Sequence, residues 1–191
     1  MFRIYRLSDV IRIDPSKFGK PLEEIAFEEL RKKYEGLKDK NLGLVLAIIN
    51  IKVDPEGFIP LGDGAPHHRV EFDVLTYVPI INEVVEGPVN IVGRMGITLK
   101  IGPLEGFVHI SQIADEEVKY DPLRNSIVLV QSKKVITQGD IVRARITSIS
   151  FVPQAKLPRI SMTMRQPYLG KLEWIEEKIR KFSFHDEPRK V

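Results

Sequence analysis

The chain is 191 residues long and contains no cysteine. The absence of thiols excludes disulfide bonds and cysteine-ligated metal sites. No stretch approaches the roughly 20 consecutive apolar residues that a membrane-spanning helix needs, because Asn50 and Lys52 interrupt the most apolar segment, residues 42–53. The first residues also lack the apolar core of a secretory signal peptide. These absences predict a soluble protein of the cytoplasm with no part in a membrane.

A large excess of charge of one sign is also absent. The sequence has 29 Lys and Arg against 26 Asp and Glu, which gives a formal net charge of +3 and a pI near 9.0. Such a balance permits contact with nucleic acid without requiring it. Any charge that binds nucleic acid must therefore be concentrated locally.

The sequence lacks the common motifs of catalysis. It has no Gly-x-x-x-x-Gly-Lys-Ser/Thr phosphate loop, no Gly-x-Gly-x-x-Gly dinucleotide loop and no Gly-x-Ser-x-Gly nucleophile turn. Asp63, His67 and His68 lie close together, but their spacing matches no zinc pattern. We therefore predict no metal, no cofactor and no catalytic site, so that the chain is not an enzyme on its own.

The first half, residues 1–80, is predicted to be an α+β domain. Apolar residues recur at helical spacing from Pro21 to Tyr34, with Gly36 beyond the helix end. Strands are expected at residues 2–7, 10–13, 44–53 and 69–78. The 44–53 strand is apolar on both faces, so we expect it to be central and covered on both sides.

A loop rich in small residues separates the last two of these strands. It reads Leu-Gly-Asp-Gly-Ala-Pro-His-His over residues 61–68. Glycine and proline at this density predict a projecting loop. It is either a simple hairpin connection or a docking loop centred on Gly62, Asp63 and Gly64.

The second half, residues 81–191, is predicted to be a small β-barrel. Residues 86–113 contain two short strands hinged on Gly96 and a third after a Gly-Pro turn. Residues 139–146 and 159–163 supply closing strands. In this order the segments resemble the S-one type of OB fold, named after a ribosomal protein, which holds single-stranded nucleic acid on its outer face.

Two further segments accompany the barrel. Residues 114–138 form a long insertion between barrel strands. A final helix is predicted from its apolar stripe, which consists of Leu172, Ile175, Ile179 and Phe182. The charged tail from His185 is predicted to be disordered.

OB barrels bind single strands through stacking aromatic side chains and a basic groove. The S-one pattern normally carries two exposed phenylalanines, but the matching positions here hold Met95 and Thr98. The predicted RNA-contacting residues are Arg94, Lys100, Phe107, His109, Arg143, Arg145 and Arg159. Without the two phenylalanines, we expect binding to be weak and mainly electrostatic. The alternative is a barrel that serves protein contacts only.

Further stretches identify a narrower family. Residues 164–175 follow the last barrel strand and read Met-Arg-Gln-Pro-Tyr-Leu-Gly-Lys-Leu-Glu-Trp-Ile. The first half carries Phe-Arg-Ile-Tyr at 2–5, Lys-Tyr-Glu-Gly at 33–36 and Gly-Asp-Gly at 62–64. In that order these stretches resemble the larger of the two stalk subunits of archaeal RNA polymerase, known as E-prime, which is the counterpart of the seventh subunit of eukaryotic polymerase II.

This resemblance implies a role in transcription. The first half would be an RNP-like tip domain that docks on the polymerase core beside the clamp, with Gly62, Asp63 and Gly64 among the docking elements. The barrel would lie near the RNA exit path and hold single-stranded nascent RNA. The smaller stalk subunit, a helical protein designated F and the counterpart of the eukaryotic fourth subunit, would form a heterodimer with the chain. The family assists promoter opening, while the large subunits carry the nucleotidyltransferase chemistry.

Two other interpretations remain open at this stage. A free RNA-binding factor of translation or RNA decay would bind RNA strongly by itself, and the missing stacking aromatics argue against it. A subunit of a nuclease or processing enzyme would carry a carboxylate cluster for divalent metal near the barrel, and the sequence shows none.

Overall fold

The structure is a computed structural model that describes residues 1–151 and 157–183. The chain divides into two compact units, Met1–Pro79 and Ile80–Val191. The tail from His185, which the sequence predicts to be disordered, lies outside the described residues. The fold prediction of an α+β protein with a C-terminal OB barrel is confirmed.

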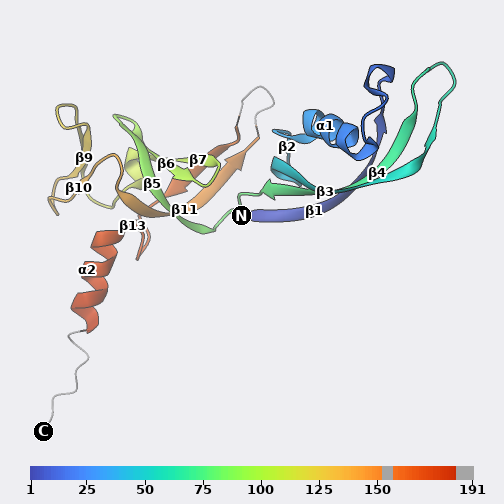
Figure 1. The fold of residues 1–191 in the computed structure, drawn as a ribbon. Coiled ribbons are helices and arrows are strands. Elements are labelled where there is room, and N and C mark those ends of the chain that lie inside the picture. The colour runs from blue at the N-terminus through green and yellow to red at the C-terminus, as the bar shows by residue number, and fades with distance from the viewer. Residues whose placement is uncertain (152–156, 184–191) are drawn as a thin grey trace, which may run out of the picture. The chain divides into compact units, whose positions relative to one another are not determined.

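The first unit is a four-stranded sheet with one long helix. Its elements are β1 (Phe2–Arg12), a 3-10 turn (Pro15–Lys17), α1 (Leu22–Tyr34), β2 (Lys38–Asp39), β3 (Gly43–Phe58) and β4 (His67–Tyr77). The strand order is β1-β4-β3-β2, and all pairs are antiparallel. Figure 1 shows α1 lying against one face of this sheet.

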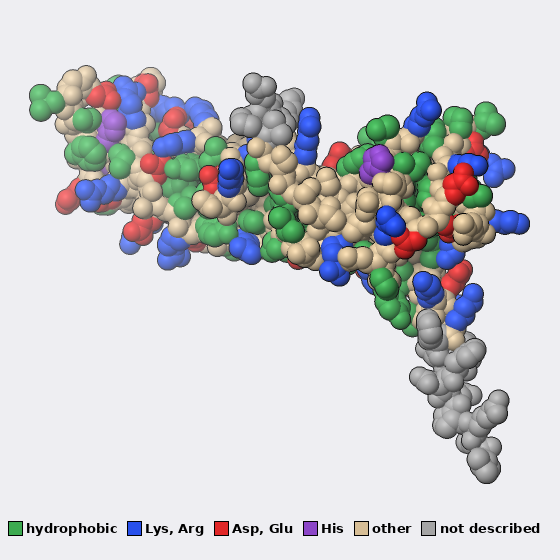
Figure 2. Space-filling model, turned by 180° about the vertical axis from the view of Figure 1, so that it is seen from behind, with side chains coloured by type: hydrophobic (Ala, Val, Ile, Leu, Met, Phe, Trp, Pro, Cys, Tyr) green, Lys and Arg blue, Asp and Glu red, His purple; other side chains and the backbone are tan. Residues whose placement is uncertain are grey.

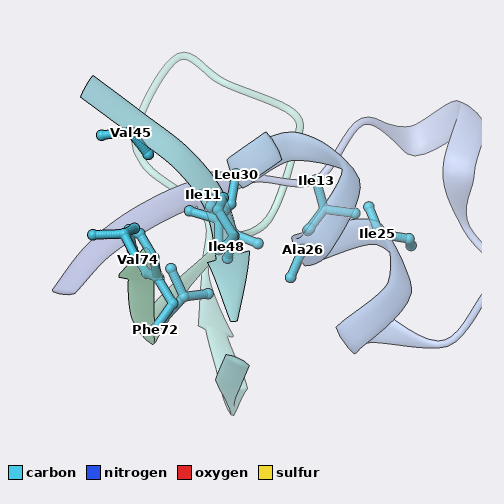
Figure 3. Packing of buried hydrophobic residues seen from close by; sticks show 10 residues of the cluster. Ile11, Ile13, Ile25, Ala26, Leu30, Val45, Ile48, Phe72 and Val74 are labelled. Carbon is cyan, nitrogen blue, oxygen red and sulfur yellow. The ribbon is translucent and has the colours of Figure 1, made fainter. Parts of the chain in front are cut away.

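The core of the first unit lies between α1 and the sheet. Ile25, Ala26 and Leu30 of the helix belong to one buried cluster with residues of the strands, as Figure 3 shows. The cluster comprises Ile11, Ile13, Ile25, Ala26, Leu30, Val45, Ile48, Val70, Phe72 and Val74. The predicted helix and its glycine terminator are confirmed, since Gly36 has a φ of +81°, a conformation that favours glycine.

The two short strands predicted at residues 2–7 and 10–13 are one continuous strand. β1 pairs with β4 residue for residue from Phe2 to Arg12. Asp9, a poor strand former, is accommodated because its carboxylate accepts hydrogen bonds from Lys33 Nζ at 2.6 Å and Tyr34 Oη at 2.8 Å. The prediction was wrong because these partners come from α1 and are invisible in the local sequence.

The expectation that residues 44–53 are covered on both faces is also wrong. Bulges interrupt the β3–β4 register between Val45 and Ala47 and between Ile49 and Ile51. Each bulge adds one residue to β3, so the apolar alternation is shifted and resembles a continuous run. The inserted Asn50 has a φ of +51° and is exposed. Val45 and Ile48 of β3 belong to the core formed with α1, whereas Leu46 and Ile49 are only half-buried and Asn50 and Lys52 are exposed.

The second unit is built around a closed barrel. Its strands are β5 (Val84–Gly93), β6 (Gly96–Ile101), β7 (Leu104–His109), β11 (Ile141–Ser150) and β12 (Arg159–Thr163). They pair in the order β12-β7-β6-β5-β11, and β11 pairs again with β12, which closes the barrel. The β7–β12 pair is parallel and the others are antiparallel. The predicted barrel strands are thus confirmed.

Further elements complete the second unit. They are a 3-10 turn (Ile110–Gln112), β8 (Val118–Asp121), β9 (Ser126–Leu129), β10 (Val135–Ile136), β13 (Gly170–Lys171) and α2 (Leu172–Ser183). β8 to β10 form a small separate sheet within the predicted insertion. Ile175 of α2 is buried, Leu172 is half-buried and Ile179 is exposed, whereas the side chain of Phe182, also in the predicted stripe, lies outside what the structure describes. Among the described residues, no helix is both long and apolar enough to cross a membrane.

Candidate nucleic-acid interface and docking loop

The outer side of β6 and β7 carries a row of side chains that could contact a nucleic-acid base. Thr98 of β6 and Phe107 of β7 are cross-strand partners, and Ser161 of β12 lies beside Phe107 on the other side. Phe107 is 39% exposed, whereas its neighbours Gly106 and Val108 face the barrel interior and are buried. The strand alternation therefore places the Phe107 ring on the outer surface.

A second row lies at the β5–β6 turn. His109 pairs with Gly96, and the Ile110 amide donates a 2.9 Å hydrogen bond to the Met95 carbonyl. The His109 ring lies 6.4 Å from the Phe107 ring and is held by a 2.8 Å contact between its Nδ1 and Ser111 Oγ. Exposed Arg94 and Met95 occupy the turn itself. We call Arg94, Met95, Thr98, Phe107 and His109 the barrel face.

Two glycines allow the strands under this face to approach closely. A side chain at Gly96 would place its Cβ 2.1 Å from the Val108 carbonyl oxygen, and the Gly96 φ of +145° disfavours any other residue. A Cβ at Gly106 would lie 2.1 Å from Met162 Sδ in the barrel interior. These positions fix the register that turns Phe107 and His109 outward.

The predicted basic residues do not form one groove. Arg94 belongs to the barrel face. Lys100 lies toward the opposite end of β6, where its cross-strand partner is Glu105. Arg159 is exposed at the start of β12, just before Ile160, the partner of Gly106. Acidic Glu105 thus lies on the strand between the two cations and reduces their combined field.

The two predicted arginines of β11 are differently placed. Arg143 Nε donates a 2.7 Å hydrogen bond to Glu86 Oε1 across the β5–β11 pair, so its charge is already matched. Arg145 is half-buried, and its buried Nε has no hydrogen-bond partner among the described residues. Neither arginine adjoins Phe107 in the strand order, because β5 and β6 on one side and β12 on the other separate β11 from β7.

Sequence reasoning missed two neighbours of the barrel face. Ile91 is exposed beside Thr98 because a bulge between Val89 and Ile91 turns it outward. Ser161 enters only through the parallel β7–β12 pair. No local signal marks either residue, since both depend on register between strands.

The predicted docking loop connects β3 and β4. Gly62 has a φ of +89°, and added Cβ atoms at Gly62 or Gly64 would meet nothing within 4 Å. Asp63 makes two hydrogen bonds with Arg12 of β1, from Nε at 2.8 Å and from Nη2 at 3.1 Å. His67 Nε2 lies 3.0 Å from the same carboxylate. No feature of the sequence indicates that Arg12 contacts this loop.

The charged partners of Asp63 determine its ionisation. Hydrogen bonds from Arg12 and then His67 hold the pKa of the Asp63 carboxyl well below its usual range, although the loop is largely solvated. His68, the third residue of the unmatched zinc-like cluster, instead places Nδ1 2.9 Å from the Asp54 carbonyl. Across residues 1–151 and 157–183 there is no group of three or more His, Asp and Glu side chains that could hold a metal ion.

Comparison with known proteins assigns each half to a family. Residues 8–64 match the SHS2 domain found in the N terminus of Rpb7p/Rpc25p/MJ0397, and residues 78–150 match the S1 RNA binding domain. The DNA-directed RNA polymerase II subunit rpb7 of Schizosaccharomyces pombe is 29% identical over 90% of this chain and 99% of its own length.

Archaeal proteins are more similar. DNA-directed RNA polymerase subunit Rpo7 of Saccharolobus solfataricus is 53% identical over 93% of this chain and 98% of its own length. The Rpo7 of Sulfolobus acidocaldarius is 49% identical over 96% of this chain and 100% of its own length. These matches confirm the resemblance seen in the sequence: the chain belongs to the family of the archaeal DNA-directed RNA polymerase subunit Rpo7, the counterpart of eukaryotic Rpb7.

Proposed function

We propose that this chain is the non-catalytic stalk subunit of an archaeal DNA-directed RNA polymerase. The first unit docks on the polymerase core beside the clamp through the β3–β4 loop, which contains Gly62, Asp63 and Gly64. The barrel binds single-stranded nascent RNA, and the smaller stalk subunit pairs with the chain. The assembled stalk aids promoter opening. It acts in the cytoplasm, where archaeal transcription takes place, and needs no cofactor.

The observation that carries this proposal is the extent of the similarity to Rpo7. Identity of 53% extends over 98% of the relative's length, so both units and the block after the barrel are included. A free RNA-binding factor that shared only the barrel would match over the second half alone. Membership of a polymerase-subunit family supports docking on the core and pairing with the smaller stalk subunit.

The geometry of the barrel face favours weak binding of single strands. Phe107 offers one exposed aromatic surface, and each stacked base contributes about 1–3 kcal/mol. Arg94 supplies a cation on the same face, and such a contact to phosphate is sequence-independent and salt-sensitive. Met95 and Thr98 replace the usual stacking aromatics, so the face has little capacity for a second or third base. Weak, sequence-tolerant binding suits a protein to which the polymerase itself delivers RNA.

Reconstitution tests the proposal directly. Archaeal core polymerase lacking its stalk is mixed with the full chain and the smaller stalk subunit, and the complex is purified by size exclusion and analysed by mass spectrometry. The proposal expects both proteins to co-purify with the core and to increase promoter opening. If the chain instead binds RNA tightly but never associates with the core, it is a free RNA-binding factor.

A further inference from the structure

A cavity lies where the insertion between the barrel strands meets α2. Its volume is about 370 Å³, which is within the usual range for sites that bind small ligands. We call it the α2 pocket. Its wall includes two aromatic side chains and three cations, namely Tyr168, Trp174, Lys134, Arg165 and Lys178. Aromatic rings and cations together are the groups that hold the bases and phosphates of a single strand.

Tyr168 occupies a backbone position that ordinarily belongs to glycine or asparagine. The Leu169 amide donates a 3.2 Å hydrogen bond to the Gln166 carbonyl, which closes a four-residue turn. Tyr168 is the third residue of this turn, and its φ of +61° is the conformation that a type II turn requires there. A tyrosine is strained in this conformation, and its ring is 51% exposed. Strain of this kind at an exposed aromatic residue indicates a use for the ring.

Trp174 supplies the second ring of the pocket and is held in place from two sides. Lys134 Nζ, from the insertion, lies 5.0 Å from the centroid of the ring. A Cβ added at Gly170 would lie 3.5 Å from Trp174 Cε3, so the backbone of β13 passes close to the ring edge. The side chain is half-buried. A ring fixed in this way loses little conformational freedom when a base packs against it.

The charges in the wall of the α2 pocket are only partly cancelled. Arg165 forms a salt bridge with Asp115. The second carboxylate of the wall, Glu116, accepts hydrogen bonds at 2.8 Å from two backbone amides of the insertion. The wall then has two further cations, Lys134 and Lys178, against this one carboxylate. A small positive excess of this kind attracts phosphate weakly and in a salt-dependent way.

A smaller cavity connects the α2 pocket with the barrel face. Its volume is about 260 Å³, and it shares four wall residues with the α2 pocket, among them Asp115 and Arg165. Its wall also includes Ser111, whose Oγ lies 2.8 Å from Nδ1 of His109 in the barrel face. On the face drawn in Figure 2, cationic and anionic side chains are interspersed over the unit that carries α2. A strand that follows this surface therefore depends on stacking more than on a basic groove.

We propose that the α2 pocket is a second base-binding site for single-stranded RNA, in which one base packs against Tyr168 and Trp174. The inference rests on the proposed function, because it extends the path of the RNA beyond the barrel face. A strand stacked on Phe107 reaches the α2 pocket along the smaller cavity. Two sites on one strand hold it more tightly than either site alone. The second site thus offsets the loss of the usual stacking aromatics from the barrel face.

The emission of Trp174 tests the proposal without a label, because the sequence contains no other tryptophan. The full chain is titrated with single-stranded RNA on the order of 12 nucleotides long, which is within the site size of one OB barrel. We expect this strand to quench the emission, and a free nucleoside monophosphate to do so only at far higher concentration. Equal quenching by the free nucleotide would overturn the proposal, since the pocket would then be a nucleotide site apart from the RNA path.

Two other outcomes separate the pocket from the barrel face. Unchanged Trp174 emission, while fluorescence anisotropy shows that the labelled strand is bound, would refute the α2 pocket and leave the barrel face as the RNA site. Quenching by the smaller stalk subunit but not by RNA would identify a protein contact and would also refute it. If the chain binds no RNA at all, the proposed RNA-binding function fails as well.

Tyr168→Asn removes the ring and keeps a residue that tolerates the left-handed backbone. The dissociation constant for the same RNA should rise roughly 5- to 150-fold, which is the contribution of one stacked base. The free energy of unfolding should stay the same or rise, whereas a purely structural role of the ring would lower it. Leu123→Asn is the matched control, because Leu123 is exposed in the insertion and lies outside the pocket wall. Wild-type RNA affinity in Tyr168→Asn, or an equal loss in Leu123→Asn, would contradict the proposal.

Discussion

Replacing Phe107 by alanine should weaken RNA binding while sparing the barrel. The ring lies on the outer side of β7 and is 39% exposed. One stacked base contributes about 1–3 kcal/mol, which corresponds to roughly a 5- to 150-fold rise in the dissociation constant for single-stranded RNA. The ring's cross-strand contact with Thr98 is worth only about 0.2–1 kcal/mol of folding free energy. Phe107→Ala therefore separates binding from stability.

Val108 provides the matched control on the same strand. Its side chain points into the barrel and is 0% exposed. Val108→Ala removes buried methyl groups and is expected to lower the free energy of unfolding by about 2 kcal/mol. The barrel face itself is unchanged, so the folded variant should bind RNA like the wild type.

The assay is fluorescence anisotropy with a labelled single-stranded RNA at low salt, paired with urea denaturation of each variant. The two variants should show opposite patterns, one losing affinity and the other losing stability. Wild-type affinity in Phe107→Ala would refute the assignment of the barrel face. A loss of affinity in fully folded Val108→Ala would indicate that the facing of β7 is inverted, since a slip of one residue exchanges the two sides.

Three further predictions concern RNA binding by the barrel, its packing and the ionisation of Tyr34. Arg94→Gln should reduce the slope of log RNA affinity against log salt concentration by about 0.7. Arg143→Gln should leave the slope unchanged because the Glu86 carboxylate already neutralises that arginine. Titrations of RNA binding at several salt concentrations test both variants. Gly106→Ala places a Cβ 2.1 Å from Met162 Sδ and should cost about 1–3 kcal/mol of unfolding free energy, and an unchanged urea midpoint would contradict the packing. Burial and the hydrogen bond to the Asp9 carboxylate raise the pKa of Tyr34 from 10.0 to about 12. The neutral phenol therefore stabilises the fold fully below pH 10, and this stabilisation is lost as the pH rises through about 12. Unfolding free energy should therefore fall more steeply over this range in the wild type than in Tyr34→Phe, and parallel curves would argue against it.

Much of the fold could be predicted from local patterns. The helix over residues 22–34 is visible because its apolar spacing and the following Gly36 agree. The barrel strands are marked by glycines at sites of close approach, of which Gly96 is an example. The local sequence did not predict the burial pattern of β3, because bulges at Leu46 and Asn50 change the phase in which its side chains alternate between the two faces. The energy of a bulge depends on the partner strand, which the β3 sequence does not contain.

The candidate site was less predictable than the fold. Phe107 and His109 could be chosen from their place in the third barrel strand, and the structure brings them together on one surface. The pairing of Arg143 with Glu86 joins residues 57 positions apart, so its charge could not be discounted in advance. Arg12 is 51 positions from Asp63, so the hydrogen bonds between them could not be predicted either. The sequence shows which residues are charged or aromatic. It does not show which of the charges are neutralised by partners distant in the sequence.

The most direct test of the central claim places a photoreactive group at the barrel face of a working polymerase. The full chain carrying benzoylphenylalanine in place of Phe107 is assembled with core polymerase and the smaller stalk subunit, and elongation complexes with radiolabelled transcripts of increasing length are irradiated. Leu123, exposed in the insertion, is substituted in the same way as a reference. We predict crosslinks at position 107 once the transcript has emerged from the enzyme, at a yield well above that at position 123. Equal yields at both positions, or none at 107 for any transcript length, would contradict the claim that this chain binds nascent RNA as part of the polymerase.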